Sequence, residues 1–241
     1  MTQFRPDPIA YLTGRATGGA LPPGISAPGK GGKFAPDGTR LDWPGNTMIC
    51  HVDRGSDAHA ALVAIKDGLA AGPHGGHFSF LPDASLHMTV FQGISGPFAN
   101  RFDWPEGVDR NATRDEVTAI LRARLSGIAL PASRRIRALN VHAGHSMTVD
   151  GTGPDEEGLR ATRAALREAT GIAPAGFGTY TFHITLAYPL RWLSEDEARA
   201  VIALGDALFA AHGPRLQDIV LGRVELCNFE HMHHFETLCL L

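Results

Sequence analysis

The stretch LHMTV at residues 86–90 recurs with the same pattern as FHITL at residues 182–186. In each copy an apolar residue is followed by histidine, an apolar residue, threonine and a further apolar residue. Successive side chains of a β-strand point to opposite faces of the sheet, so the histidine and the threonine of each copy share one face. We therefore expect two strands, each anchored by an apolar face and each presenting a polar His/Thr pair.

His87 and His183 are the candidate catalytic residues. One such motif is a weak signal in a chain with twelve histidines, and an isolated histidine would be interpreted as an ordinary strand residue. The repetition favours a shared site. An imidazole with a pKa of about 6.5 can be neutral or protonated near neutral pH, so two of them can act as base and acid. The pattern does not indicate which histidine has which role.

The two stretches resemble the motifs of the two-histidine (2H) phosphoesterase superfamily. That superfamily includes bacterial RNA 2′,3′-cyclic phosphodiesterases, also called 2′-5′ RNA ligases, and related cyclic-nucleotide phosphodiesterases. FHITLAYPL at 182–190 is close to the usual form, and LHMTVFQGI at 86–94 fits the usual strand that ends in a small-residue turn. Elsewhere only the order of elements matches, and the first motif comes later than in short members, after a Gly/Pro-rich segment.

The resemblance implies a metal-independent phosphoesterase that hydrolyses a cyclic phosphate or a 2′-5′-type phosphodiester of a nucleotide or RNA end. His87 and His183 would exchange protons with the reacting oxygens, while Thr89 and Thr185 bind the phosphoryl oxygens. No metal or cofactor is expected. Three alternatives stay open: an RNA-end ligase that uses the same site, a non-catalytic nucleotide-binding module, and a zinc hydrolase.

Two aromatic residues are candidates for substrate binding. Tyr188 follows the second motif at the expected end of its strand, and Phe91 is expected on the same face as His87. Either ring is as readily explained as a core residue.

The zinc alternative depends on histidines near the C-terminal end. They are His231, His233 and His234, to which His142 and His145 could add ligands. A turn at the surface or cleft edge explains the cluster better, because no acidic or cysteine ligand has a recognised spacing. Less functional weight falls on His51, His59, His74, His77 and His212.

Composition places the chain among ordinary globular proteins. It has 241 residues, 44% of them hydrophobic and 20% charged, with a net charge of −3. This balance disfavours binding of duplex nucleic acid but permits a small nucleotide or an RNA end. Cys50, Cys227 and Cys239 are expected to be reduced. With no apolar run of signal-peptide or membrane-span length, we expect a cytoplasmic protein without a membrane partner, and a monomer.

The chain divides into two parts. Residues 1–45 form a Gly/Pro-rich N-terminal extension, expected to be ordered but irregular and to border the cleft. Residues 46–241 are expected to form one bilobal domain, in which a strand-helix-strand-strand unit occurs around each motif. The predicted fold is α+β, with two pseudo-symmetric antiparallel-sheet lobes and flanking helices around a central cleft. This arrangement is also the one that the resemblance implies.

Overall fold

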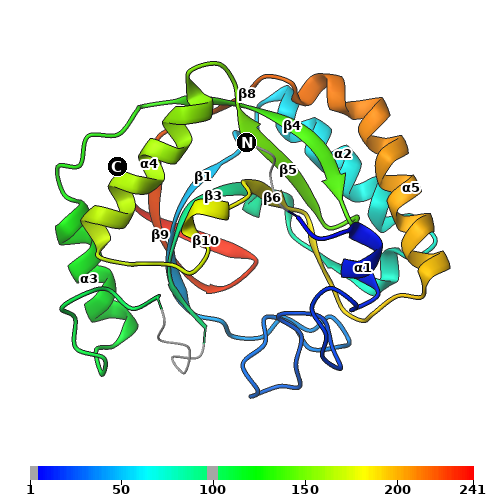
Figure 1. Cartoon of the computed structure of the whole chain (residues 1–241), viewed down its shortest axis with the longest axis horizontal. Coiled ribbons are helices and arrows are strands. Elements are labelled where there is room, and N and C mark those ends of the chain that lie inside the picture. The colour runs from blue at the N-terminus through cyan, green and yellow to red at the C-terminus, as the bar shows by residue number, and fades with distance from the viewer. Residues whose placement is uncertain (1–4, 97–102) are drawn as a thin grey trace.

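The computed structural model describes residues 5–96 and 103–241 and consists of a curled antiparallel sheet flanked by helices (Figure 1). The α-helices are α1 (Pro8–Leu12), α2 (Asp57–Ala70), α3 (Arg114–Leu125), α4 (Asp155–Thr170) and α5 (Glu195–His212). The strands are β1 (Gly45–His51), β2 (Phe78–Phe80), β3 (His87–Ser95), β4 (Arg134–His142), β5 (Ser146–Gly151), β6 (His183–Thr185), β7 (Ala187–Pro189), β8 (Ile219–Leu221), β9 (Glu225–His231) and β10 (His234–Leu240).

Eight strands form one sheet in the order β10-β9-β1-β3-β6-β5-β4-β8, with every neighbouring pair antiparallel. The two motif strands, β3 and β6, are the middle pair. The strand-helix-strand unit β1-α2-β3 on one side corresponds to β5-α4-β6 on the other, because each unit pairs its outer strand with a motif strand. The predicted α+β fold with two pseudo-symmetric lobes is confirmed. Both lobes share one continuous sheet.

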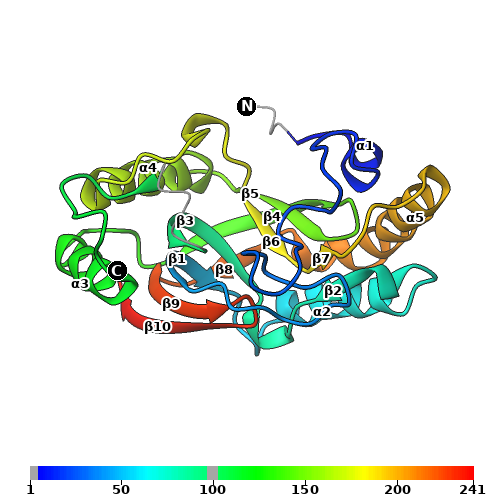
Figure 2. The ribbon, with the colours of Figure 1, turned by 90° about the horizontal axis from the view of Figure 1, so that it is seen from below.

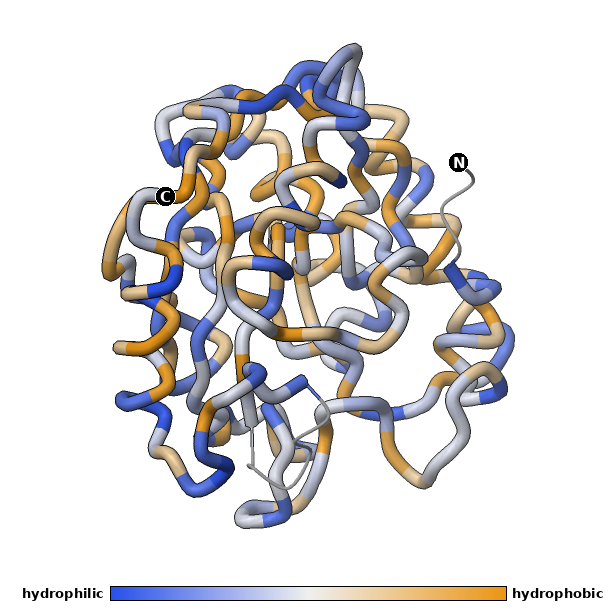
Figure 3. Tube along the Cα trace, turned by 60° about the vertical axis from the view of Figure 1, so that its left-hand side comes forward, coloured by the Kyte–Doolittle hydropathy of each residue, from blue (hydrophilic) through white to orange (hydrophobic). Residues whose placement is uncertain are grey.

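The four long helices lie in two pairs, with α3 and α4 at one end of the molecule and α2 and α5 at the other (Figures 1 and 2). They pack on one face of the sheet, where the strand residues Met48, Met88, Met147 and Ile184 are completely buried. Hydrophobic residues are common along the central strands, and hydrophilic residues are more frequent in the outer loops (Figure 3). The opposite face of the sheet carries the motif histidines, and we call it the motif face.

Local sequence signals determine the helix ends that hold this framework. A capping box begins α3, with Thr113 and Glu116 satisfying each other's backbone N–H groups. The side chain of Ser194 caps α5 by accepting from Glu197 N. Helix α4 ends at Gly171, whose φ of 69° is the left-handed conformation that glycine adopts at little cost.

The N-terminal segment, residues 1–45, packs against the motif face, although its first four residues lie outside the described part. Phe34 is completely buried and belongs to an apolar cluster with Ile49 of β1 and Phe229 of β9. The backbone N–H of Trp43 donates to Glu230 O at 2.8 Å. Apart from the short helix α1, the segment is irregular, as its glycines and prolines predict.

Candidate functional site

The two motif strands are direct neighbours and pair through Met88 and Ile184. In this antiparallel register His87 lies beside Thr185, and the corresponding neighbour of His183 is Thr89. Met88 and Ile184 point into the helix-covered core and are completely buried, whereas the His/Thr residues of the motif face are half-buried. The two histidines are therefore diagonal neighbours, a relationship that typically separates residues by about 7–8 Å.

Two rows of side chains cross the motif face at this point. In order across strands β1, β3, β6, β5 and β4, the first row is His51, His87, Thr185, Ser146 and His142. The second row, in the same order, is Ile49, Thr89, His183, Thr148 and Asn140. The motif residues thus lie in the middle of a polar stripe, to which each of the five strands contributes a hydroxyl or an imidazole.

Both motif histidines are oriented by the same local contact. The Nδ1 atom of His87 lies 2.6 Å from Ser85 O, and Nδ1 of His183 lies 2.9 Å from Thr181 O. In each case the carbonyl belongs to the residue two positions earlier. Since a carbonyl only accepts, Nδ1 carries the proton and a neutral ring keeps its lone pair on Nε2. The two halves of the sheet therefore present equivalent Nε2 acceptors.

Burial lowers the pKa of His87 to about 4, and it lowers the pKa of His183 to about 4 as well. The two histidines are near enough for a charge on His183 to lower the pKa of His87 further. Both rings are consequently neutral near pH 7 when nothing is bound. An anion held between them would favour protonation of either ring, which is the condition that general acid catalysis requires.

The side of the site next to His87 contains a second histidine and a carboxylate. His51 Nδ1 donates to Glu225 Oε2 at 3.0 Å, and the His51 ring lies 6.0 Å from the His87 ring. The Glu225 carboxylate, which raises the pKa of His87, has its own pKa held at about 2 by hydrogen bonds from His51 and Thr237 despite partial burial. Phe235 packs edge-on against His87, with ring centroids 4.3 Å apart. On this side, therefore, a charge on His51 lowers the pKa of His87 and the Glu225 carboxylate raises it.

The side next to His183 is cationic. Arg5 Nη1 donates to Ser146 Oγ at 2.7 Å, and the charge of Arg5 lowers the pKa of His183. Lys33 lowers the same pKa, and its Nζ lies 3.3 Å from the hydroxyl of Tyr188. Both cations come from the N-terminal segment. The N-terminal segment was expected to border the cleft, and it places two positive charges beside His183.

Comparison with known proteins finds a family that is similar to part of this chain. Residues 33–147 match a family model described as "2H-phosphodiest: Domain of unknown function (DUF1868)". This part of the chain, just under half of its length, is similar to a 2H-phosphodiesterase family. The matched range contains the first motif, ends before the second, and begins within the N-terminal segment.

The whole fold of this chain is also found in a solved structure. It is similar to the crystal structure of a conserved protein of unknown function from Agrobacterium tumefaciens, with a TM-score of 0.87 and 27% sequence identity. The similarity covers 98% of this chain and 99% of that chain. No curated protein matches the sequence. Within the described residues, no helix is long and apolar enough to span a membrane.

The two candidate aromatic residues have different surroundings. Tyr188 on β7 is half-buried, packs against Phe34 and contacts Lys33, so it lies beside the cationic side of the site. Phe91 does not share the face of His87, and the prediction for its position is wrong. The pairing of β1 with β3 shifts by one residue between Thr89 and Phe91, and this β-bulge turns Phe91 into the core, where it is completely buried.

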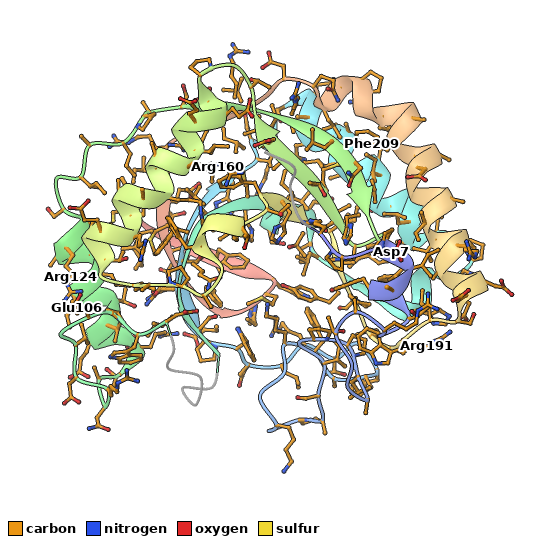
Figure 4. The ribbon with its side chains drawn as sticks, in the orientation of Figure 1. Asp7, Glu106, Arg124, Arg160, Arg191 and Phe209 are labelled. Atoms are coloured by element: carbon orange, nitrogen blue, oxygen red, sulfur yellow. The ribbon has the colours of Figure 1, made fainter. Side chains whose placement is uncertain are left out.

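The C-terminal histidines do not gather into a set of metal ligands in the described part of the chain. His231 and His233 lie beside each other, and His233 packs against Phe34. Three potential ligand atoms do approach within 4.8 Å of one another elsewhere, on His74, His77 and Glu197. There the Arg191 guanidinium contacts His77 and donates to Glu197 Oε1 at 2.6 Å, so a cation already occupies this position (Figure 4).

Sequence reasoning missed several residues of the stripe. His51 had little functional weight, although it ends β1, where strand pairing puts it beside a motif histidine. Ser146 and Thr148 alternate with Met147 and Val149 in the same way, and this was a usable signal. Arg5 and Glu225 had no signal, because they reach the site only through the tertiary fold.

Proposed function

We propose that this chain is a metal-independent phosphoesterase that hydrolyses a cyclic phosphate or a 2′-5′-type phosphodiester of a nucleotide or RNA end. The observation that carries the proposal is the equivalent presentation of two Nε2 atoms, one from each half of the sheet, with a threonine beside each. A phosphoryl group between β3 and β6 would have an imidazole on each side and hydroxyl donors for its non-bridging oxygens.

The proposed reaction is displacement at phosphorus by water. One neutral imidazole takes a proton from water as the new P–O bond forms, and the other, protonated, gives its proton to the oxygen whose bond to phosphorus breaks. His87 is assigned as the acid because it is the motif histidine with a carboxylate nearby, Glu225, which stabilises its protonated form against the opposing effect of His51. The surrounding charges favour His183 as the base, because Arg5 and Lys33 oppose its protonation. The threonine hydroxyls donate to the phosphoryl oxygens.

The choice between hydrolysis and ligation depends on the nucleophile. The same site would ligate RNA ends if a 5′-hydroxyl replaced water, whereas a binding module would hold the phosphate without turnover. The N-terminal segment, which contains Lys33, covers part of the motif face. This cover favours a small substrate. The net charge of −3 does not favour binding of a long nucleic-acid duplex.

The test is turnover in the presence of EDTA of 2′,3′-cyclic nucleotides, RNA ending in a cyclic phosphate, and ADP-ribose cyclic phosphate. The products are followed by phosphorus NMR, with and without RNA bearing a 5′-hydroxyl to detect ligation. Wild-type protein should open at least one cyclic phosphate, and the His87→Ala/His183→Ala double variant should not. His212→Ala, at the end of α5, is the matched control. Absence of turnover on every substrate, or full activity of the double variant, would overturn the proposal.

A further inference from the structure

The His183 side of the site has more hydroxyl and cationic groups than one phosphodiester needs. The scissile phosphate of the proposed reaction already has two imidazoles and two threonine hydroxyls around it. Ser146 and Thr148 extend the polar stripe by one strand, on β5, and they pair with Thr185 and His183 respectively. Since neighbouring strands are about 4.8 Å apart, groups on β5 reach a point displaced from the β3–β6 gap.

Thr148 is the first sign that this extension receives a ligand. Its side chain is 3% exposed and points to the motif face, because its neighbours Met147 and Val149 are in the core. Among the residues that the structure describes, its hydroxyl has no hydrogen-bond partner. Buried hydroxyl groups are normally satisfied, because an unmade hydrogen bond costs free energy. A ligand oxygen beside His183 would satisfy Thr148.

Arg5 is the second, independent sign. Its guanidinium is largely buried, and burial lowers its pKa to about 10. Among the described residues no carboxylate forms an ion pair with Arg5, and its polar contact is the neutral Ser146 hydroxyl. The nearby Asp7 caps α1 by accepting from Ala10 N (Figure 4). A buried guanidinium without a carboxylate is expected where an anion binds.

Lys33 adds a further cation from the other end of the N-terminal segment. Its ammonium lies over the rings of Trp43 and Tyr188, at 5.6 and 5.0 Å from their centroids. No carboxylate in the described part of the chain pairs with it either. These ring contacts hold the charge near His183 without neutralising it.

We infer that Arg5, Lys33, Ser146 and Thr148 form an anion subsite for a second phosphate of the substrate, distinct from the phosphate that reacts. This inference rests on the proposed function. The substrate class becomes a nucleotide that carries both a cyclic or diester phosphate and another phosphate. The subsite lies on the His183 side alone. On the His87 side, the position that corresponds to Thr148 is occupied by His51, which is hydrogen-bonded to Glu225.

The first experiment measures binding without turnover. Calorimetry compares adenosine 2′,5′-bisphosphate with adenosine 2′-monophosphate on the wild type, Arg5→Gln, Lys33→Gln and Thr148→Val. The bisphosphate should bind at least about tenfold more tightly to the wild type, and Arg5→Gln and Lys33→Gln should each remove most of that advantage. Arg5→Lys should restore part of it. Arg15→Gln and Lys30→Gln, which remove exposed cations of the same segment, are the matched controls.

The second experiment compares turnover of 2′,3′-cyclic AMP with that of its 5′-phosphorylated form. Arg5→Gln and Lys33→Gln should raise KM for the phosphorylated substrate several-fold more than KM for the unphosphorylated one, whereas any change in kcat that comes through His183 should be the same for both substrates. Equal losses on both substrates would show that the cations hold the reacting phosphate, and equal affinity of the wild type for both adenosine ligands would also overturn the subsite. A binding advantage without turnover of any cyclic phosphate would instead overturn the proposed function alone.

Discussion

His51 is the cross-strand neighbour of His87, in the place that Thr148 takes beside His183 in the other half of the sheet. The two motif histidines therefore have different neighbours although their own strands are equivalent. His51 hydrogen-bonds to Glu225 at 3.0 Å, which brings a carboxylate to one side of the site.

Glu225→Gln should slow the step in which His87 gives its proton to the leaving oxygen. The Glu225 carboxylate stabilises positive charge on His87, so its loss should lower kcat by about tenfold, equivalent to about 1.4 kcal/mol in the barrier. Steady-state kinetics on the cyclic phosphate that the wild type opens would measure this. Glu236→Gln, a change of an exposed residue on the neighbouring β10, is the control, and an unaltered kcat in Glu225→Gln would contradict the role of the carboxylate.

Lys33→Gln should raise the pKa of His183 above about 4, because removing a nearby positive charge makes protonation easier. Proton NMR of the histidine ring signals as a function of pH would measure the change. Lys30→Gln should leave the His183 titration where it is. If both variants titrate like the wild type, Lys33 does not act on this side of the site.

Single substitutions should separate proton transfer from binding. His87→Ala and His183→Ala should each lower kcat by roughly 10²–10⁴-fold, the usual contribution of one positioned proton-transfer group. Thr89→Val and Thr185→Val should cost less, since they remove one hydroxyl donor each and keep the size of the side chain. Melting temperatures near that of the wild type would show that the fold persists. A larger kcat loss in a Val variant than in both Ala variants would reverse the assignment.

Acid should destabilise the ligand-free protein before carboxylates become protonated. Burial lowers the folded-state pKa of His87, His142 and His183 to about 4 and that of His145 further, from about 6.5 when unfolded. The unfolded chain then binds more protons, so stability is complete above pH 6.5 and falls towards pH 4. The melting temperature should fall by several degrees over this range.

The His87→Gln/His183→Gln double variant provides the control for this pH dependence. It removes two of the four titrating groups, so its melting temperature should change less between pH 6.5 and 4. The same slope in both proteins would assign the acid sensitivity to other groups.

Deleting residues 1–44 should destabilise the protein as well as alter recognition. Leu12 and Phe34 are completely buried, and loss of the burial of two such side chains lowers the free energy of unfolding by about 3–6 kcal/mol. The melting temperature should therefore fall by roughly 10 °C or more. Calorimetry would measure this, and an unchanged melting temperature would show that the segment does not contribute its packing to the stability of the sheet.

The sequence predicted what depends on local alternation and missed what depends on the tertiary fold. Period-two alternation placed His87 and His183 on strands with their threonines. The same alternation failed at Phe91, because a β-bulge depends on the pairing with β1 rather than on residues 86–94. Arg5 and Glu225 were out of reach for a related reason: they lie more than 80 positions from His87 in the chain and are brought to the site only by packing.

The pairing of Met88 with Ile184 leaves the two lobes joined at the site by a very short ladder, since β6 has only three residues. Strand β6 is held more extensively on its other side, where all three of its residues pair with β5. A phosphate held by groups on both strands would supply a bridge that the backbone lacks. The substrate would thus act as a cross-link for the protein, and amide hydrogen exchange at Met88 and Ile184 should slow when a ligand is bound.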